Sequence, residues 1–314
     1  MAAVSGIVRK ASDVPKEFYI TKDQEGRRVD RLLRTMWPQV PLGAIMKALR
    51  KGEVRLDAKK VSADTRLKEG QFLQVPWSDD APLGAMAQNP ASSAKYPPLD
   101  TLYKDDYLWI VNKPAGLLTQ PDTKGGDSLI TRALAELEWT RLDFHPSTVQ
   151  RLDRNTSGVV IIALCGRSQR TLSEFIRERK IKKIYRAVVS GETEESGEIN
   201  LPLLKDSESN TVKVDAKGQN ALTRYRRLSL GKFGSTVEVE LVTGRPHQAR
   251  VHLSAIGHPI LGDCKYGSGK GAKRPLLHAF SVSFPNDAAL PESLRGLTIS
   301  APMPDDMKEF FYEM

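Results

Sequence analysis

Residues 149–158 read Val-Gln-Arg-Leu-Asp-Arg-Asn-Thr-Ser-Gly, and the next six, residues 159–164, read Val-Val-Ile-Ile-Ala-Leu. The second run is short, uncharged and rich in β-branched residues, which predicts a buried strand. The first run is a polar loop that ends in glycine, and loops carried by rigid strands often hold functional residues. Asp153 lies in this loop between two arginines, whose charges favour an anionic side chain. Taken alone, such an aspartate is most simply half of a surface ion pair.

Similar apolar segments recur through the rest of the chain, separated by polar and basic stretches. They are Leu108–Val111, Tyr185–Val189 and Val237–Val242. A helix is predicted over Ser168–Lys180, where apolar residues such as Leu172 and Ile176 recur at helical spacing. Many short strands and few helices predict an α+β domain over residues 99–314, built on a mixed, mostly antiparallel β-sheet.

The N-terminal part has a different pattern, which predicts two short amphipathic helices and a few short strands. Val29 to Met36 and Leu42 to Leu49 both place apolar residues at i, i+3, i+4 and i+7. Gly52 is a typical helix stop, and strands are expected around Val54–Leu56, Val61 and Phe72–Val75. Residues 15–76 therefore form a small α+β module. Residues 77–98, rich in Ala, Pro, Ser and Gly, are expected to be a linker.

The net charge of the chain is +9, and its distribution is uneven. Residues 1–76 hold 16 lysines and arginines against nine aspartates and glutamates, which places seven of the nine net charges there. Such an excess indicates a polyanionic partner, most simply a nucleic acid, although a basic surface also serves solubility. The basic residues on the outward helix faces include Arg27, Arg28, Arg31, Arg34, Lys47, Arg50 and Lys51.

Composition excludes several other classes of protein. No apolar run approaches the roughly 20 residues that a membrane span needs, and residues 1–15 lack the apolar core of a signal peptide. Cys165 and Cys264 form no disulfide framework and no metal pattern, so a reducing, cytoplasmic setting is expected. Phosphate-cradling, dinucleotide-binding and serine-hydrolase motifs are absent from the sequence.

Four separated segments carry the residues best suited to chemistry. They are Val111–Gly116, the Asp153 loop, Lys182–Val188 with Tyr185, and Thr243–His252, which continues to Gly267. The last contains Arg245, His247, Gln248 and Arg250, a concentration of cationic and hydrogen-bonding groups. His247 and His252 lack a cysteine or carboxylate at a familiar metal-ligand spacing, so we expect no metal site.

Together and in this order, the four segments resemble the RluA-type pseudouridine synthases, above all the members that act on large-subunit ribosomal RNA. The most specific pieces are Arg-Leu-Asp-Arg-x-Thr-Ser-Gly and Thr-Gly-Arg-x-His-Gln-x-Arg-x-His, about ninety residues apart. The likeness covers nearly the whole chain. Residues 15–76 resemble the small RNA-binding module named after a small-subunit ribosomal protein, through Arg-Val-Asp-x-Leu-Leu at 28–33 and Leu-Arg-Lys-Gly-Glu-Val-Arg-Leu at 49–56.

The resemblance implies a role for each matching residue. Asp153 matches the essential aspartate, and Arg250 matches the arginine that pairs with it. Tyr185 matches the tyrosine that stacks on the target base and is implicated in the later proton removal. Arg151 matches the arginine that fills the RNA helix once the base is flipped out. Gln150 stands where histidine is usual, and Ala249 replaces a larger aliphatic residue.

The implied activity is the isomerisation of uridine to pseudouridine without metal or redox cofactor, by a monomer that binds structured RNA. The expected RNA-contacting residues are Arg151, Arg154, Thr156, Arg245, His247, Gln248, Arg27, Arg28, Arg31, Lys47, Arg50 and Lys51. Two alternatives stay open: a non-catalytic RNA-binding ribosome-assembly protein on the same fold, or a synthase for transfer or mitochondrial RNA. A binder has no need of the set Asp153, Tyr185 and Arg250, so their presence favours the enzyme.

Overall fold

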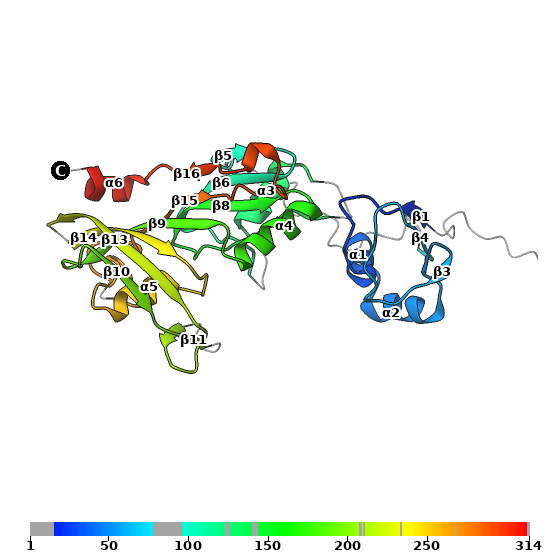
Figure 1. The fold of residues 1–314 in the computed structure, drawn as a ribbon, viewed down its shortest axis with the longest axis horizontal. Coiled ribbons are helices and arrows are strands. Elements are labelled where there is room, and N and C mark those ends of the chain that lie inside the picture. Colours follow the sequence, from blue (N-terminus) through cyan, green and yellow to red (C-terminus); the bar gives the residue numbers. More distant parts are fainter. Residues whose placement is uncertain are drawn as a thin grey trace, which may run out of the picture. The chain divides into compact units, whose positions relative to one another are not determined.

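The computed structural model describes residues 16–77, 96–122, 126–139, 144–206, 209, 211–232, 234–267 and 269–312 (Figure 1). The chain divides into two compact units. The smaller comprises Met1–Pro97, Leu134–Pro146 and Cys165–Arg167, and the larger comprises Pro98–Ala133, Ser147–Leu164 and Ser168–Met314. Most of the expected linker, residues 78–95, lies outside the described residues.

The smaller unit holds two helices and a four-stranded antiparallel sheet with the strand order β1-β4-β2-β3. Its elements are β1 (Lys16–Tyr19), α1 (Val29–Met36), α2 (Leu42–Lys51), β2 (Arg55–Leu56), β3 (Lys59–Lys60) and β4 (Phe72–Val75). The apolar stripes of both helices are buried in one core, with Leu32, Leu33 and Ile45 fully inaccessible to solvent. Both predicted helices are therefore confirmed.

Helix α2 ends where the sequence predicts. Gly52 has the left-handed conformation, with φ of 75°, and its N–H closes the last turn. The strand expected around Val61 is displaced, because β3 is Lys59–Lys60 and Val61 follows it as a buried residue. Arg55 and Leu56 pair with Lys60 and Lys59 across a turn made by Asp57 and Ala58, both at positive φ.

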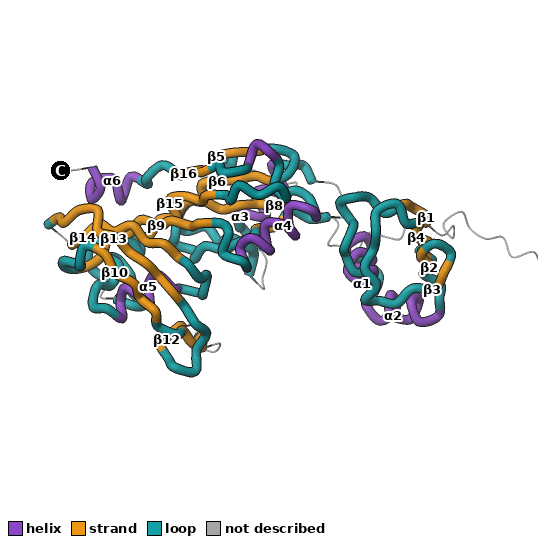
Figure 2. Tube along the Cα trace, viewed as in Figure 1, coloured by secondary structure: helices purple, strands orange, loops and turns teal. Residues whose placement is uncertain are grey.

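The larger unit is built on a ten-stranded sheet (Figures 1 and 2). Eight strands follow the order β10-β13-β14-β9-β15-β8-β6-β5, while β16 pairs with β15 and β7 pairs with β8. These strands are β5 (Thr101–Lys104), β6 (Leu108–Lys113), β7 (Ser147–Thr148), β8 (Ser157–Ala163), β9 (Lys182–Ser190), β10 (Ser196–Asn200), β13 (Leu222–Gly231), β14 (Gly234–Leu241), β15 (Leu277–Ser283) and β16 (Thr298–Ser300). All pairs are antiparallel except β8 with β15, so the predicted fold class is confirmed.

The remaining elements of the described chain are one small hairpin and several helices. They are α3 (Leu129–Glu136), α4 (Gly166–Arg177), β11 (Leu203–Asp206), β12 (Thr211–Val214), α5 (Gln248–Ala255), the 3₁₀ helix η3 (Glu292–Leu294) and α6 (Asp305–Tyr312). Helix α5 packs against β13 and β14. Helix α4 begins two residues before the predicted Ser168 and ends three residues before the predicted Lys180.

The parallel pair of β8 and β15 joins the two halves of the large sheet. Ser157 and Gly158 lie opposite His278 and Ala279. Gly158 has φ of 113°, and a Cβ there would lie 2.2 Å from the carbonyl oxygen of Ala279. Glycine is therefore required at the end of the loop that carries Asp153, because any side chain would push β8 away from β15. Strand β8 itself is buried along its whole length, as predicted.

Candidate active site

The loop between β7 and β8 places Asp153 through contacts made by its backbone neighbours. The hydroxyl of Thr119 donates to the carbonyl of Leu152 at 2.8 Å and accepts from the N–H of the same residue at 3.1 Å. The N–H of Thr156 donates to the carbonyl of Asp153 and closes a turn around it. The side chain of Asp153 is thus left to project from a backbone that is held on both sides, and it is 29% exposed.

Lys113, at the end of β6, fastens this loop from behind. Its buried ammonium donates to the carbonyls of Pro114, Leu117 and Arg154 at 2.9, 2.8 and 3.1 Å. Burial lowers the pKa of Lys113 to about 7, while the charge of Asp153 raises it and that of Arg274 lowers it further. Three acceptors use all three N–H groups of an ammonium, so this lysine ties the segment 114–117 to the Asp153 loop.

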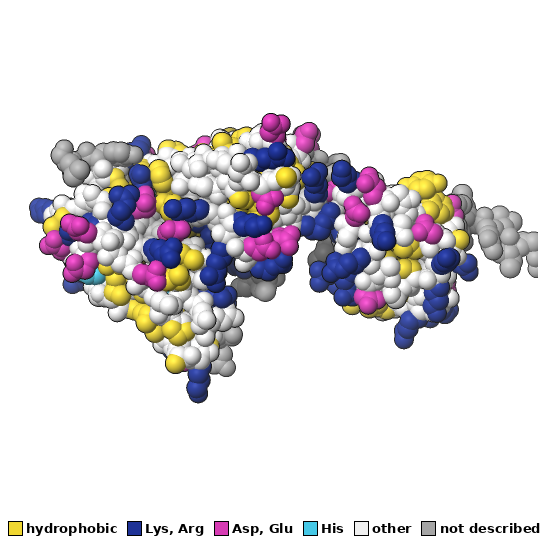
Figure 3. All heavy atoms as spheres, in the orientation of Figure 1, with side chains coloured by type: hydrophobic (Ala, Val, Ile, Leu, Met, Phe, Trp, Pro, Cys, Tyr) yellow, Lys and Arg dark blue, Asp and Glu magenta, His cyan; other side chains and the backbone are white. Residues whose placement is uncertain are grey.

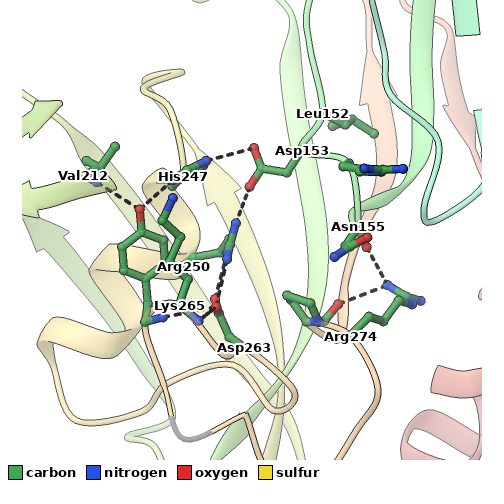
Figure 4. A network of polar contacts seen from close by, with 12 residues as sticks. Leu152, Asp153, Asn155, Val212, His247, Arg250, Asp263, Lys265 and Arg274 are labelled. Atoms are coloured by element: carbon green, nitrogen blue, oxygen red, sulfur yellow. Dashed lines mark hydrogen bonds and ion pairs between the residues drawn. The ribbon is translucent and has the colours of Figure 1, made fainter. Parts of the chain in front are cut away.

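Arg250, in α5, lies between two carboxylates (Figure 4). Its Nη1 donates to Oδ2 of Asp153 at 2.9 Å. Its Nε and Nη2 donate to the two oxygens of Asp263 at 2.7 and 2.8 Å, a bidentate pair. Burial would lower the pKa of Arg250, but the hydrogen bonds of Asp263 and Asp153 raise it overall. The guanidinium therefore stays charged and is aimed at Asp153 by a partner that is itself 1% exposed.

Asp263 has further support from the backbone. Its Oδ1 accepts from the N–H groups of Lys265 and Tyr266 at 3.0 and 3.2 Å. Burial raises the pKa of Asp263, but the Arg250 hydrogen bonds and these two N–H groups hold it below its ordinary value. The carboxylate is consequently a fixed anion, and it fixes the direction of the Arg250 fork.

His247 approaches Asp153 from the other side. Its Nε2 lies 3.8 Å from Oδ1 of Asp153, and its Nδ1 is hydrogen-bonded to the hydroxyl of Tyr266. The N–H of Val212 donates to that same hydroxyl at 3.0 Å (Figure 4). The proton of the Tyr266 hydroxyl is then free to point at His247. Burial lowers the pKa of His247, which favours a neutral ring. With Nδ1 as the acceptor, the ring proton sits on Nε2, toward Asp153.

Tyr185, in β9, is 8% exposed and lines the same cleft as Asp153 and Arg250. Burial raises the pKa of Tyr185, and the nearby charge of Asp153 raises it further. Tyr185 is accordingly a phenol and not a phenolate in the free protein.

The cleft has a volume of about 660 Å³ and is lined by the loop 149–156, by β9 and by the segment 244–247 with Arg250.

The structure brings together Asp153, Tyr185 and Arg250, the three residues expected to act in catalysis. Of the expected RNA contacts, Arg151, Arg154, Thr156, Arg245 and His247 also line this cleft. Arg151 and Arg154 are exposed, whereas Thr156 is buried. Gln150 lines the cleft too, and its Oε1 is a buried atom with no hydrogen-bond partner among the described residues.

Gln248 has a different setting from the other expected RNA contacts. It is 2% exposed, and its Nε2 donates to the carbonyl of Leu222 and the hydroxyl of Thr223, both at 2.9 Å. Its Oε1 accepts from the hydroxyl of Thr243 and the N–H of Arg245. Because protein groups use both ends of its amide, we assign Gln248 to holding the segment 243–245 against β13.

The expected basic contacts of the N-terminal part belong to the smaller unit and lie on or beside α1 and α2. Arg31, Lys47, Arg50 and Lys51 are exposed. Arg28 pairs with Asp30 at 2.9 Å, and Arg27 donates to the hydroxyl of Thr35. Lysine and arginine side chains recur over the face of this unit that Figure 3 presents. Their role in RNA binding stays a prediction.

Sequence reasoning did not assign a role to Lys113, Asp263 or Tyr266. All three lie in segments that the sequence singled out, Val111–Gly116 and Thr243–Gly267, but their roles follow from burial and from hydrogen bonds that no local pattern indicates. Among the described residues, no cluster of histidine, cysteine and acidic side chains has the arrangement of a metal site. Within the same residues, no helix is long and apolar enough to cross a membrane.

Comparison with known proteins gives a consistent result. The family model described as RNA pseudouridylate synthase matches residues 107–255. The chain is 32% identical over 308 residues to the ribosomal large subunit pseudouridine synthase C of Vibrio cholerae, covering 94% of this chain and 95% of that protein. It is 33% identical over 305 residues to the protein of the same name from Escherichia coli K12, covering 92% and 93%. Among solved structures, human RNA pseudouridylate synthase domain containing 1 superposes with a TM-score of 0.55 at 25% identity, over 68% of this chain and 86% of that one.

Proposed function

Because this chain belongs to the RNA pseudouridylate synthase family, we propose that it converts uridines of large-subunit ribosomal RNA to pseudouridine, with Asp153 as the catalytic anion. The reaction breaks the bond between N1 of uracil and C1′ of ribose and forms a bond between C5 and C1′. N1 gains a proton and C5 loses one, so no atom enters or leaves. The names of the relatives support the ribosomal substrate, and the site geometry supports the role of Asp153.

The target base must first leave the RNA stack, which costs a few kcal/mol. The exposed Arg151 lies at the rim of the cleft beside Asp153, where it can enter the RNA helix in place of the flipped base. Tyr185 offers an aromatic face inside the cleft, and stacking of a base on an aromatic ring contributes about 1–3 kcal/mol. These two contacts offset the cost of flipping.

Asp153 then acts at the ribose in one of two ways. It attacks C1′ as a nucleophile and forms a covalent sugar ester, or it removes a ribose proton and leaves an eliminated sugar. Both routes need an aimed, ionised carboxylate close to the sugar. Arg250 supplies the aim through its 2.9 Å hydrogen bond, and Asp263 holds Arg250 in place. The uracil turns in the cleft before C5 bonds to C1′.

Tyr185 completes the site. Since burial and Asp153 raise its pKa, it enters the reaction as a phenol that donates a hydrogen bond. Tyr185 can remove the C5 proton only after its own phenol proton has left. Asp153 is the carboxylate whose charge raises the pKa of Tyr185. We propose that the two groups share this last proton transfer. The enzyme is further proposed to work as a cytoplasmic monomer, with the basic smaller unit gripping structured RNA.

One observation carries the proposal: Asp153 and Arg250, 97 residues apart in the chain, meet at 2.9 Å in a cleft beside Tyr185. The test compares the purified Asp153→Asn variant with the wild type on large-subunit ribosomal RNA transcripts, by pseudouridine mapping and by RNA binding. We expect turnover to be abolished and binding to be kept. Asp106→Asn, an exposed aspartate outside the cleft, is the matched control and is expected to be fully active. Pseudouridine formation by Asp153→Asn would contradict the assignment.

A further inference from the structure

Lys183 presents a half-buried cation that the proposed mechanism does not use. It lies in β9, two residues before Tyr185, so both side chains are on the same face of the strand. It lines the same cleft as Asp153. It is half-buried, and burial lowers the pKa of its ammonium with no partner acting against that shift. Among the described residues, no carboxylate or carbonyl pairs with it.

Two other lysines show how unusual this is. Lys113 is also withdrawn from water, but three carbonyls accept its N–H groups. Lys182, the neighbour of Lys183, is 55% exposed on the opposite face and lies 3.8 Å from Glu240. An ammonium withdrawn from water without a partner is destabilised, because nothing replaces its hydration. A cation without an anionic partner in this cleft is therefore explained if a bound ligand supplies the negative charge.

The head of Lys183, and not only its aliphatic stem, is placed by the fold. A Cβ at Gly244 would lie 3.4 Å from its Nζ, so the ammonium sits against the backbone of the segment 243–245. A lysine whose stem covers apolar surface usually extends its charge into solvent. Here the charge is instead kept inside the cleft, next to the place where Tyr185 and Asp153 act.

The chemistry of the cleft identifies the missing anion. Its lining includes the cations of Arg151, Arg154, Lys205 and Arg245, while Asp153 supplies its carboxylate, which Arg250 already takes. Arg154 and Arg245 use their Nε atoms on the carbonyls of Gly116 and Asn220. Among the described residues that line it, this cationic cleft has no free carboxylate, which suits a phosphodiester, the group that gives an RNA strand one negative charge per nucleotide.

We propose that Lys183 binds a backbone phosphate next to the flipped nucleotide and thereby sets how deeply the base enters beside Tyr185. Residues i and i+2 of a strand are about 7 Å apart, a distance that one nucleotide spans between its base and a flanking phosphate. The inference rests on the proposed function for the identity of the RNA. The contact itself is a property of the cleft and can be measured by binding alone.

The experiment uses three variants of the full chain: Lys183→Met, which keeps the stem and removes the charge, Lys183→Arg, which keeps the charge, and Lys182→Met as the matched control. We expect Lys183→Met to weaken binding of a large-subunit ribosomal RNA transcript by about tenfold and to reduce the slope of log K against log salt by about one. Lys183→Arg should recover most of this affinity, and Lys182→Met should match the wild type. Thermal unfolding should show Lys183→Met to be at least as stable as the wild type, because it removes an unpaired buried charge.

A second arm separates a phosphate from a uracil oxygen as the ligand. A short RNA containing the mapped uridine is made with natural linkages or with one uncharged methylphosphonate on either side of that uridine. One of these two neutral linkages should reduce binding by the wild type to the level of Lys183→Met, and should cost the Lys183→Met variant nothing more. Equal losses in both proteins, or a kcat defect in Lys183→Met with an unchanged salt slope, would overturn the phosphate contact. Absence of pseudouridine from the wild-type reaction would refute the proposed function but leave the transcript-binding and salt-slope results of the three variants decisive for Lys183.

Discussion

At the scale of single residues, Arg250 shows which parts of the site a sequence pattern predicts and which parts depend on burial in the folded protein. The motif around Arg250 and the motif around Asp153 are both visible in the sequence, and the resemblance implies that the two residues pair. Asp263 is equally important to the geometry, because it takes two of the N–H groups of Arg250. One aspartate after a glycine carries no local signal. Only its burial, with two backbone N–H groups aimed at it, distinguishes Asp263 from a surface carboxylate.

Histidines show the same limit. The sequence pattern does not distinguish His247, His252 and His258, but their surroundings in the structure differ. His252 is fully buried between Thr223 and the carbonyl of Leu201, and His258 is half-buried. His278, which no motif marks, is fully buried, and its Nδ1 is hydrogen-bonded to the hydroxyl of Ser157 at 2.9 Å. It thus links β15 to the start of β8, directly after the Asp153 loop.

His278 predicts a pH dependence of stability. Burial lowers the pKa of His278 to about 4 in the folded protein, against an ordinary value of 6.5. Between these values the unfolded chain binds a proton at this residue and the native chain does not, so stability increases with pH over that interval. The contribution is constant above pH 6.5 and falls by about 3 kcal/mol as the pH drops to 4. Denaturant unfolding of the wild type and of His278→Gln at several pH values measures it.

The variant His278→Gln should lose this part of the pH dependence, whatever its stability at neutral pH. His258→Gln is the control, since that residue is only half-buried and its Nδ1 lies 3.0 Å from the carbonyl oxygen of Ser190. It is expected to keep the wild-type dependence. Parallel curves for His278→Gln and the wild type between pH 6.5 and 4 would show that His278 does not carry the effect.

At the scale of helices and strands, periodicity predicted the elements better than their ends or their order. Helix α4 is an instructive example, because the apolar spacing continues to Ile176 and suggests a helix to Lys180. The helix ends at Arg177 because Arg179 has φ of 60°, and the N–H of Lys180 returns to the carbonyl of Phe175. This is a Schellman-type end, which normally has glycine at the left-handed position. Because arginine occupies this position in α4, the sequence does not indicate where the helix ends.

The order of the strands in the sheet could not be predicted from the sequence pattern, for a different reason. Apolar runs identify β6, β8, β9 and β14, but the pairing partners of β8 and β9 include β15, which is about a hundred residues away in the chain. A buried strand has no feature that names its neighbour. The hairpin of β11 and β12 and the helix α6 were not predicted either, because they are short and mix apolar with charged residues.

Helix α6 nevertheless has a part in the site, and this gives a prediction at the scale of elements. Asp306 in α6 accepts two hydrogen bonds from Arg274 at 2.6 and 2.7 Å. The same guanidinium donates through Nη1 to the carbonyls of Asn155 and Pro275 (Figure 4). Asp306→Asn should therefore loosen the loop that carries Asp153, with a cost of about 1 kcal/mol because the pair is partly exposed. Faster amide hydrogen exchange over residues 154–158 and a few-fold lower kcat are expected.

Asp305 provides the matched control. It is adjacent in the same helix, is 94% exposed and pairs with Lys308 one turn along. Asp305→Asn should leave both exchange and turnover at wild-type values. If both variants accelerate exchange equally, the effect is one of general helix fraying, and Arg274 does not transmit it.

At the scale of the whole molecule, the charge distribution predicts that the smaller unit contributes to RNA binding and that the larger unit carries out the reaction. Arg31, Lys47 and Arg50 of the smaller unit are exposed cations, whereas Lys182, Arg224 and Arg226 of the larger unit each face a glutamate. Replacing the first three with glutamine should weaken RNA binding and reduce the salt slope by up to about three, with kcat at saturating RNA unchanged. Replacing the second three should change the slope much less, because their charges are already offset. Filter binding across salt concentrations, with turnover at saturation, compares the two triple variants.

The distance along the chain between Asp153 and Arg250 has a consequence for the time at which the enzyme becomes active. The loop of Asp153 belongs to the half of the sheet that contains β6 and β8, and Arg250 follows β14 in the other half. The halves are joined through β15, which is made after both of them. Contacts of such long sequence separation form late in folding, because chain entropy opposes them until the intervening segments are ordered. A partly folded chain can therefore contain Asp153, Tyr185 and Arg250 and still lack the pair of Asp153 and Arg250, so we expect activity only once the sheet is complete.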